Sequence, residues 1–140
     1  MVGFNFKFTD LQAAVALPQL DEIEQRIAIA RRRDKLYTER LANQPGLKLA
    51  AFEEPGEVRQ WTDVLIDNRT AVSTALNEAK IGHRAFWFPL HRQEPYAADV
   101  NLFPNSTDIS RRGLWLASRF DLTEPDFDRI CSVIIGALRR

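Results

Sequence analysis

The chain has 140 residues, of which 45% are hydrophobic, 10% aromatic and 27% charged. This length fits one folded domain with a sizeable core, and the aromatic content argues against intrinsic disorder. Basic and acidic side chains balance at 19 each. No net charge therefore draws the chain to nucleic acid or to an anionic membrane, and we expect neither partner. We expect a single domain over residues 1–140.

Cysteine usage and the N-terminus exclude further classes of protein. The lone Cys131 cannot form an internal disulfide, and no Cys/His spacing typical of a structural zinc site is present. Residues 1–7 lack the apolar core of a signal peptide, and no apolar run approaches the roughly 20 residues that a membrane-spanning helix needs. These features favour a reducing cytoplasm.

The first predicted helix begins at a capping box. The Thr9 hydroxyl can accept from a free backbone N–H, while Gln12 reaches back to the cap. Apolar residues then recur at three- and four-residue steps to about residue 42, which predicts a long helix with one continuous buried stripe. Pro18 lies within this stretch and lacks an amide donor, so it predicts a kink or a junction of two helices.

Two strands are predicted next, and a third follows later in the chain. Residues 47–52 and 61–66 are expected to pair as antiparallel strands on either side of a turn at residues 53–56. The aromatic residues 85–88 form the third expected strand, which Pro89 stops.

Helices and a loop are predicted between and beyond these strands. Asn68 is expected to cap a helix that Gly82 ends. Residues 93–104 have poor periodicity and many turn residues, which predicts a long loop. Asn105 or Ser106 is then expected to cap a short helix.

The C-terminal part is predicted to hold a short strand and a final helix. Residues 114–116 read as a buried extended piece, and Thr123 is expected to open the helix. The buried face of that helix is expected to comprise Phe127, Ile130, Val133, Ile134 and Leu138. The sum is an α+β fold of two layers, in which helices cover a small, mainly antiparallel sheet and long helices lead into it.

Residues capable of self-contained catalysis lack a diagnostic arrangement. His83 and His91 could pair with Cys131 or Ser118, but no hydrolase, protease or P-loop signature is present. His83 is interpreted as an exposed or capping histidine. His91 follows a predicted strand at the start of a loop, where binding groups often lie, and a buried aromatic strand with a solvent-facing imidazole is an equal alternative.

Clusters of cations are interpreted mainly as solvated. Residues 31–33 are three arginines that fan around a predicted helix at 100° each, so a solvated face is favoured over an anion clamp. The pairs at residues 111–112 and 139–140 suit helix C-termini and need no ligand. Residues 3–7 could cradle a phosphate before a helix N-terminus, or could be a frayed chain end.

Read together, several segments resemble the DegT-type family of sugar aminotransferases. The first segment resembles the family's G-x-N-x-[RK]-x-[ST]-x-x-x-A-A motif. The others resemble the long helices, strand, loop and tail of the family's C-terminal small domain. These segments are residues 3–14, 19–20, 31–32, 81–84, 88–91, Tyr96, 103–116 and 122–124. The resemblance covers nearly the whole chain, in order.

The resemblance implies a fold-type-I enzyme that depends on pyridoxal phosphate (PLP) and works as a dimer with shared active sites. By motif position, Asn5 would reach the cofactor phosphate of the neighbouring subunit, with Lys7 nearby. Arg84, His91 and Tyr96 would lie near the entrance for the sugar nucleotide. These roles are expectations that follow from the resemblance alone.

The chain departs from the family at the catalytic centre. In the family the Schiff-base lysine and the acid that pairs with the pyridinium nitrogen lie upstream of the segment where this chain begins. None of Lys7, Lys35, Lys48 and Lys80 matches the Schiff-base position. PLP chemistry needs that lysine, so the chain alone is expected to be inactive and to bind no cofactor by itself.

Two functions remain open from the sequence. The first is a truncated or split nucleotide-sugar aminotransferase whose small domain contributes substrate and dimer contacts, either as a homodimer or with a separate large-domain chain. The second is a non-enzymatic module derived from that domain, which self-associates or binds a partner or ligand.

Overall fold

The computed structural model describes residues 7–51 and 56–139. The helices are α1 (Asp10–Asp21), α2 (Ile23–Leu41), α3 (Arg69–Glu78), α4 (Pro104–Arg112) and α5 (Glu124–Leu138). The strands are β1 (Leu47–Leu49), β2 (Thr62–Ile66), β3 (Arg84–Ala85) and β4 (Gly113–Leu116), and three 3-10 turns span Leu90–Arg92, Glu94–Tyr96 and Val100–Leu102. The predicted α+β class is confirmed.

The four strands form one antiparallel sheet in the order β1-β2-β4-β3. In β2 the buried side chains Thr62, Val64 and Ile66 alternate with half-buried ones, as expected for a sheet with one covered face. Across the ladder, Thr62 faces Leu116 and Val64 faces Leu114. The buried face of the sheet is therefore continuous from β2 to β4.

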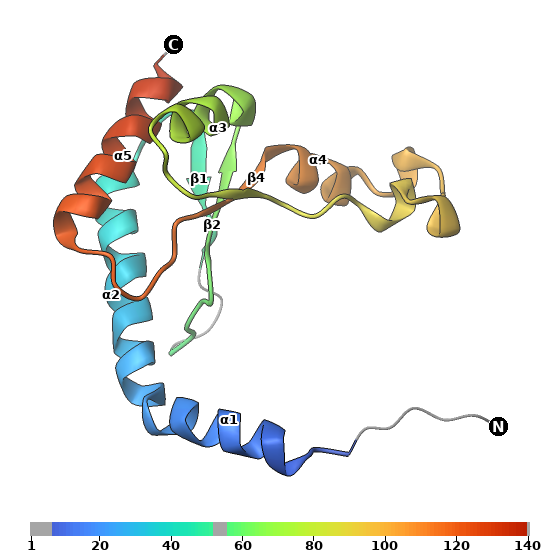
Figure 1. Ribbon diagram of the computed structural model, residues 1–140. Helices are drawn as coiled ribbons and strands as arrows, with labels where there is room; N and C mark the ends of the chain where they lie inside the picture. Colours follow the sequence, from blue (N-terminus) through green and yellow to red (C-terminus); the bar gives the residue numbers. More distant parts are fainter. Residues whose placement is uncertain (1–6, 52–55, 140) are drawn as a thin grey trace.

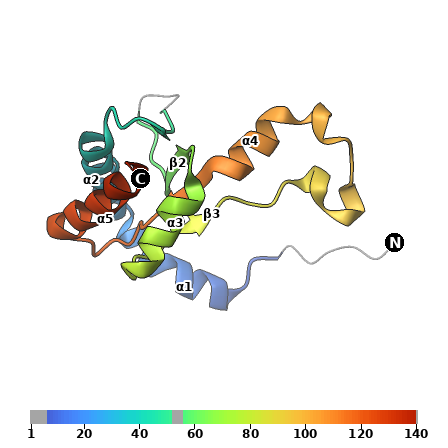
Figure 2. The same cartoon turned by 90° about the horizontal axis from the view of Figure 1, so that it is seen from above.

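The covered face packs against α2, α3 and α5, which lie together on one side of the sheet (Figures 1 and 2). Tyr37 of α2 is completely buried, meets Phe127 of α5 edge-on at 4.9 Å between ring centroids, and donates its hydroxyl to the Ala117 carbonyl at 2.7 Å. The core comprises Leu36, Tyr37, Leu41, Val64, Ile66, Val72, Leu76, Ile81, Leu114, Leu116, Phe127, Ile130, Cys131, Ile134 and Ala137.

The N-terminal helices do not form one buried stripe. A junction separates α1 from α2 at Glu22, four residues beyond Pro18, and α1 bends away from the body of the chain (Figure 1). No residue of α1 is buried, and Leu20 is 58% exposed. The predicted stripe is therefore wrong before Ala30, because periodicity shows which helix face is apolar and not whether another element covers it.

Local capping signals are largely confirmed. The Gln12 amide donates to the Thr9 hydroxyl oxygen at 3.3 Å, and the Ala71 amide donates to the Asn68 side chain at 3.3 Å. The end of α3 differs from the prediction that Gly82 ends the helix, because α3 stops at Glu78 and Lys80 takes the left-handed conformation (φ 56°) that follows a helix end.

The segment from residue 86 to residue 112 projects from the sheet (Figure 1). The predicted third strand is wrong beyond Ala85, since after the bond from the Phe86 amide to the Gly113 carbonyl (3.1 Å) the chain leaves the ladder. The predicted loop holds two 3-10 turns. Helix α4 begins at Pro104 without a side-chain cap, so Asn105 and Ser106 lie inside it and the predicted caps are wrong.

Helix α5 begins as predicted and differs slightly in its buried face. Thr123 and Asp126 form a capping box. Phe127, Ile130 and Ile134 are buried as expected, whereas Val133 and Leu138 are half-buried. Cys131 and Ala137 complete the buried face.

Candidate functional site

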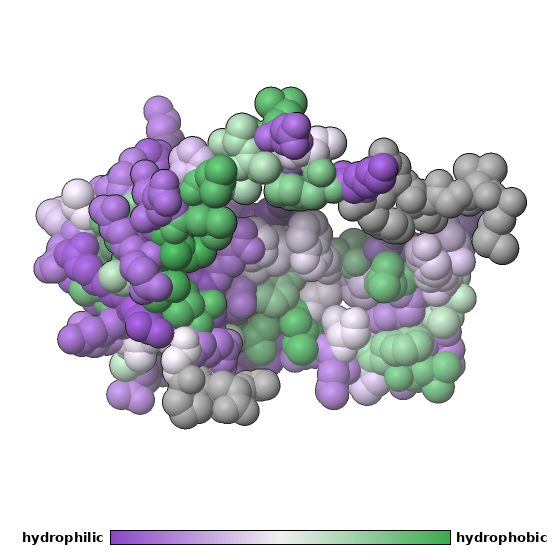
Figure 3. Space-filling model, turned by 90° about the horizontal axis from the view of Figure 1, so that it is seen from below, coloured by the Kyte–Doolittle hydropathy of each residue, from purple (hydrophilic) through white to green (hydrophobic). Residues whose placement is uncertain are grey.

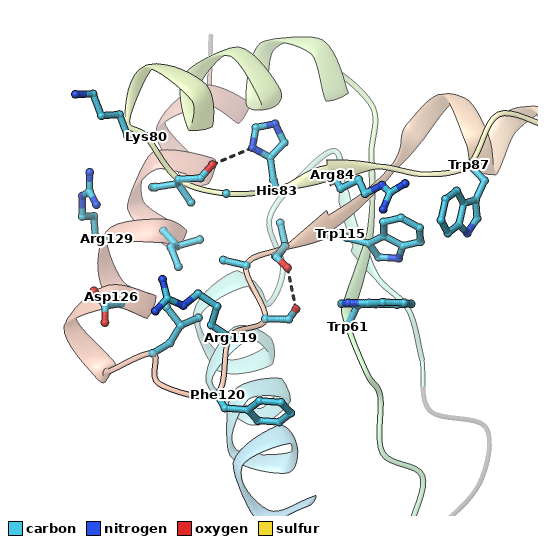
Figure 4. Close-up of a pocket in the computed structure, with 17 residues that line it drawn as sticks. Trp61, Lys80, His83, Arg84, Trp87, Trp115, Arg119, Phe120, Asp126 and Arg129 are labelled. Carbon is cyan, nitrogen blue, oxygen red and sulfur yellow. Dashed lines mark hydrogen bonds between the residues drawn. The ribbon is translucent and has the colours of Figure 1, made fainter. Parts of the chain in front are cut away.

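A groove of about 720 Å³ lies beside the edge strand β3. Its walls come from the turn after α3, from β3 and β4, from the connection between β4 and α5, and from the start of α5 (Figure 4). Tryptophan rings gather at one end of the groove and charged side chains at the other.

The aromatic end is built around Trp115. Its side chain lies on the sheet face opposite the core, because Leu114 and Leu116 on either side of it point inward. The rings of Trp61, Phe86 and Trp87 have centroids 5.3, 5.2 and 5.0 Å from that of Trp115. These tilted and edge-on contacts are favourable geometries for aromatic rings.

Asp63 anchors the Trp115 ring from the neighbouring strand. The two residues are partners across the ladder, and the indole N–H of Trp115 donates to the carboxylate. Burial raises the pKa of Asp63, and the bond from Trp115 opposes that rise. The aromatic end is therefore held in place by packing and by a polar contact.

The charged end carries more cations than anions. Lys80, Arg119 and Arg129 line this end, and Asp126 is the one lining carboxylate among the described residues (Figure 4). Asp126 accepts bonds from the Thr123 backbone and hydroxyl at 2.8 and 2.6 Å, which lower its pKa. The Asp126 carboxylate stays ionised, but the cations that line this end outnumber it, so the groove presents a positive surface.

Arg84 lies at the aromatic end of the groove (Figure 4). Its guanidinium carbon lies 4.5 Å from the centroid of the Trp87 ring and 5.6 Å from that of Trp115. Within the described residues it makes no ion pair. Cation–π contact holds the guanidinium in place while its N–H donors stay available.

A buried arginine, Arg33, is bonded to segments next to the groove. Arg33 is only 2% exposed and donates to the carbonyls of Arg59, Gln60 (3.1 Å) and Ser118 (3.2 Å). It thereby ties α2 to the residues that precede Trp61 and to the connection after β4. The predicted solvated face is wrong for Arg33, because tertiary packing covers one of three adjacent arginines that are identical in type.

Asp34 and Thr62 extend this buried network. The Thr62 hydroxyl donates to Asp34 at 3.0 Å, and the Arg33 Nε lies 3.6 Å from the same carboxylate. Burial raises the pKa of Asp34, while Thr62 and Arg33 oppose that rise. Sequence patterns gave no sign of this network, since the carbonyl partners of Arg33 are 26 or more residues away along the chain and Thr62 is 28 residues from Asp34.

The residues expected from the resemblance are not brought into one cluster. Among the described ones, Arg84 alone lines the groove. Tyr96 is 64% exposed on the projecting segment, and Lys7 is exposed just before α1. Asn5 lies outside the described residues.

His91 is buried within the projecting segment. It is 7% exposed, its Nε2 lies 3.1 Å from the Thr107 hydroxyl, and its ring stacks on Phe103 at 4.8 Å between centroids. A solvent-facing imidazole is therefore wrong. Through its contact with Thr107, the His91 side chain holds the loop against α4.

His83 is hydrogen-bonded to Ser73, and the pair resembles a serine nucleophile with its histidine base. Its Nδ1 lies 3.0 Å from the Ile81 carbonyl, so that nitrogen carries the proton and Nε2 accepts from the Ser73 hydroxyl at 2.6 Å. Ser73 lies within α3 and does not line the groove. We interpret the pair as a bond that holds α3 to the following segment.

Cys131 is equally unsuited to nucleophilic chemistry. It is buried in the core, and burial raises the pKa of its thiol to about 11. The thiol is protonated at neutral pH, whereas the thiolate is the reactive form. Within the described residues no His, Cys, Asp and Glu cluster could hold a metal ion, and no helix there is long and apolar enough to cross a membrane.

The described residues do not fit PLP as a complete cofactor site. Lys7, Lys35, Lys48 and Lys80 are all exposed, whereas the cofactor needs a lysine in an enclosed site with an acid at the ring nitrogen. Lys35, for example, pairs with Glu39 on the solvent face of α2 at 3.8 Å. The described residues offer cations suited to phosphate, and none of the lysines among them is enclosed.

The sequence of this chain is similar to those of known aminotransferases. The sequence model of the DegT/DnrJ/EryC1/StrS aminotransferase family matches residues 1–135. The chain belongs to this family. It is 28% identical to the GDP-perosamine synthase of Vibrio cholerae over 96% of its own length and 38% of the relative's. It is 26% identical to the putative PLP-dependent aminotransferase EpsN of Bacillus subtilis, over 96% and 37%.

Solved structures of aminotransferases share the fold. S. venezuelae DesV, in complex with a ketimine intermediate, superposes with a TM-score of 0.85 at 22% identity, over 100% of this chain and 39% of DesV. A family member from Brucella abortus superposes with a TM-score of 0.77 at 26% identity, over 89% and 34%. The chain thus spans about two-fifths of the length of the proteins it matches.

Proposed function

We propose that residues 1–140 form the C-terminal small domain of a PLP-dependent nucleotide-sugar aminotransferase and act in the cytoplasm. The observation that carries this proposal is the coverage: nearly all of this chain matches the family, and the match takes up about 38% of each relative. The domain contributes substrate and dimer contacts, and the Schiff-base lysine comes from a large domain. If residues 1–140 are the entire polypeptide, that large domain is a separate chain.

The proposed contacts follow the family motif. Asn5 and Lys7 approach the cofactor phosphate of a neighbouring subunit, while Arg84, His91 and Tyr96 lie on the substrate side. The exposure of Tyr96 and the position of Arg84 in the groove support these roles. The buried imidazole of His91 supports a role in shaping the loop that carries Tyr96.

The proposal predicts that this chain forms no internal aldimine. Purified chain mixed with PLP should show no aldimine absorbance band, because its lysines are exposed and an imine at such a site hydrolyses readily in water. Reduction with borohydride and peptide mass mapping should give scattered, substoichiometric labelling. EpsN of B. subtilis, treated in parallel, is the positive control. Stoichiometric labelling of one lysine would show that this chain holds its own catalytic centre.

The exposed apolar side chains of α1 favour a second candidate, a self-associating module without enzyme activity. Leu11, Val15, Leu17 and Leu20 are exposed, and Figure 3 shows apolar patches on this side of the molecule. Proteins seldom leave such a surface uncovered. Light scattering on the purified chain should then show a dimer that Leu11→Glu with Val15→Glu converts to a monomer. A monomeric unsubstituted chain would contradict this candidate.

A further inference from the structure

The projecting segment, residues 86–112, takes almost no part in the hydrophobic core. Among the described residues, the core and the partly buried apolar side chains packed against it include none from this segment. Within the segment, all of which the structure describes, only Pro89 and His91 are buried. Regions with few buried apolar contacts open at a lower free energy than the core does. The sheet with α2, α3 and α5, which we call the body, therefore holds the segment mainly through polar and aromatic contacts.

Contacts inside the segment join its outgoing chain to the returning helix α4. Near the body, the Ser110 hydroxyl donates to the Trp87 carbonyl at 2.7 Å. Farther along the segment, His91 contacts the Thr107 hydroxyl and stacks on Phe103. Trp87 is thus fastened to α4 and must move with it. The segment is therefore joined internally as one unit.

Two polar contacts hold the last turn of α4 to the body. Arg69, the first residue of α3, donates to the Ser110 carbonyl at 2.7 Å. Arg112 pairs with Asp67, which precedes α3, at 2.7 Å. Both contacts lie close along the chain to Gly113, where the chain returns to the sheet. We call these two contacts the latch.

Opening the latch leaves neither charge of its ion pair buried without a partner. The Asp67 side chain is 66% exposed, so water can solvate the carboxylate. Arg112 is also bonded to Asp108 of its own helix at 3.1 Å, and it keeps that partner when α4 moves. Separating an ion pair is costly when the charges are buried and costs little when they are exposed. The ion pair of the latch can therefore open at a low cost in free energy.

The chain leaves and re-enters the sheet at one point. The Phe86 amide donates to the Gly113 carbonyl at 3.1 Å, so the two ends of the segment are joined there. Helix α4 has 9 residues and is about 13 Å long, so a small rotation at this point moves its far end much more. The same rotation carries Trp87 away from Trp115, whereas Arg84 stays beside Trp115 in the sheet ladder.

We propose that the projecting segment swings as one unit about residues 86 and 113, and that the latch holds it where Trp87 packs on Trp115. Release of the latch separates these two rings and opens the aromatic end of the groove, where Figure 4 shows them with Trp61. Hinges are a few residues at the ends of elements that absorb backbone rotation, and residues 86 and 113 lie at the ends of β3 and β4. The swing needs neither cofactor nor substrate, so it is independent of the proposed function.

The test is a distance measurement by electron paramagnetic resonance between spin labels at the exposed positions Ala98→Cys, on the segment, and Glu78→Cys, on α3. Cys131 is buried in the core and stays unlabelled. Dilution with unlabelled chain removes distances between molecules. The intact latch should give one narrow distance distribution. Arg69→Gln should raise the ratio of open to closed chains about tenfold, and Arg112→Gln about threefold, because that ion pair is partly exposed.

The neighbouring arginine of α4 provides the matched control. Arg111 pairs with Asp108 of the same helix at 2.6 Å, so Arg111→Gln should leave the distance distribution unchanged. The variant with both Arg69→Gln and Arg112→Gln should also show a shifted tryptophan emission, because Trp87 leaves Trp115. That shift should vanish when Trp87→Phe is added. Circular dichroism checks that each variant is folded.

Three outcomes would overturn the inference. The first is an unchanged distance distribution in the variant that lacks both latch arginines. The second is an equal effect of Arg111→Gln, which would trace the change to the charge of α4 and not to the latch. The third is loss of hydrogen-exchange protection throughout the segment when the latch is removed, because an intact unit that swings keeps its internal hydrogen bonds.

Discussion

Arg33→Ala is expected to lower the free energy of unfolding by about 4 kcal/mol, within the usual range for removing one partner of a buried charge network. The substitution leaves three carbonyls without their donor and leaves the Asp34 carboxylate buried beside a cavity. Urea unfolding followed by circular dichroism measures the change. The free energy of unfolding of Arg33→Lys should lie between those of the unsubstituted chain and of Arg33→Ala. The lysine ammonium is a single point charge and cannot bond to all three carbonyls as the planar guanidinium does.

The adjacent arginine provides the matched control. Arg32 is exposed and pairs with Glu124 at 2.8 Å on the surface. Exposed pairs of this kind contribute little, so Arg32→Ala should change the free energy of unfolding by about 0.5 kcal/mol or less. Equal effects of Arg32→Ala and Arg33→Ala would contradict the buried position of Arg33. A loss confined to Arg33 would confirm it.

Gly113→Ala is expected to lower the free energy of unfolding by about 2 to 3 kcal/mol through overpacking. A Cβ at this position would lie 2.3 Å from the Phe86 ring and 2.6 Å from the Ile109 carbonyl oxygen. The carbonyl belongs to α4 and cannot move independently, so the ring and the start of β4 must shift. The backbone of Gly113 is ordinary (φ −71°), and the cost is therefore steric.

The effect should also be visible in the groove, because Phe86 packs against Trp115 with ring centroids 5.2 Å apart. A changed tryptophan emission spectrum in the folded Gly113→Ala variant is the expected sign. Gly136→Ala in α5 is the control, since its Cβ would meet nothing within 4 Å. That substitution should raise the free energy of unfolding by about 0.5 to 1 kcal/mol through helix propensity. Destabilisation by both would argue against a specific clash at Gly113.

Local signals in the sequence predicted the parts of this chain that depend on neighbours along it. Thr9 with Gln12, Asn68, and Thr123 with Asp126 all cap the helices that their spacing indicates. Such contacts span three residues, so their geometry follows from the backbone alone. Antiparallel pairing of residues 47–52 with 61–66 was predicted for a similar reason, since a turn-rich stretch separates two apolar runs, and the structure pairs residues 47–49 with 64–66.

The candidate site was only partly predictable. Arg84 was named from a family motif and does lie in the groove, but its contact with Trp87 and Trp115 depends on the pairing of β3 with β4. Trp61 enters from before β2, more than 50 residues from Trp115 in sequence. The spacing of residues along the chain does not show which distant residues come into contact.

The sequence by itself determined the family, the α+β class and most helix starts, because these depend on motif order, periodicity and short-range hydrogen bonds. Only the tertiary structure decided which arginine of residues 31–33 is buried, that α1 leaves its apolar side chains exposed, and that tryptophans and cations share one groove. The physical reason is that burial depends on what another part of the chain covers. The type of a residue and its neighbours along the chain do not determine which other segment covers it.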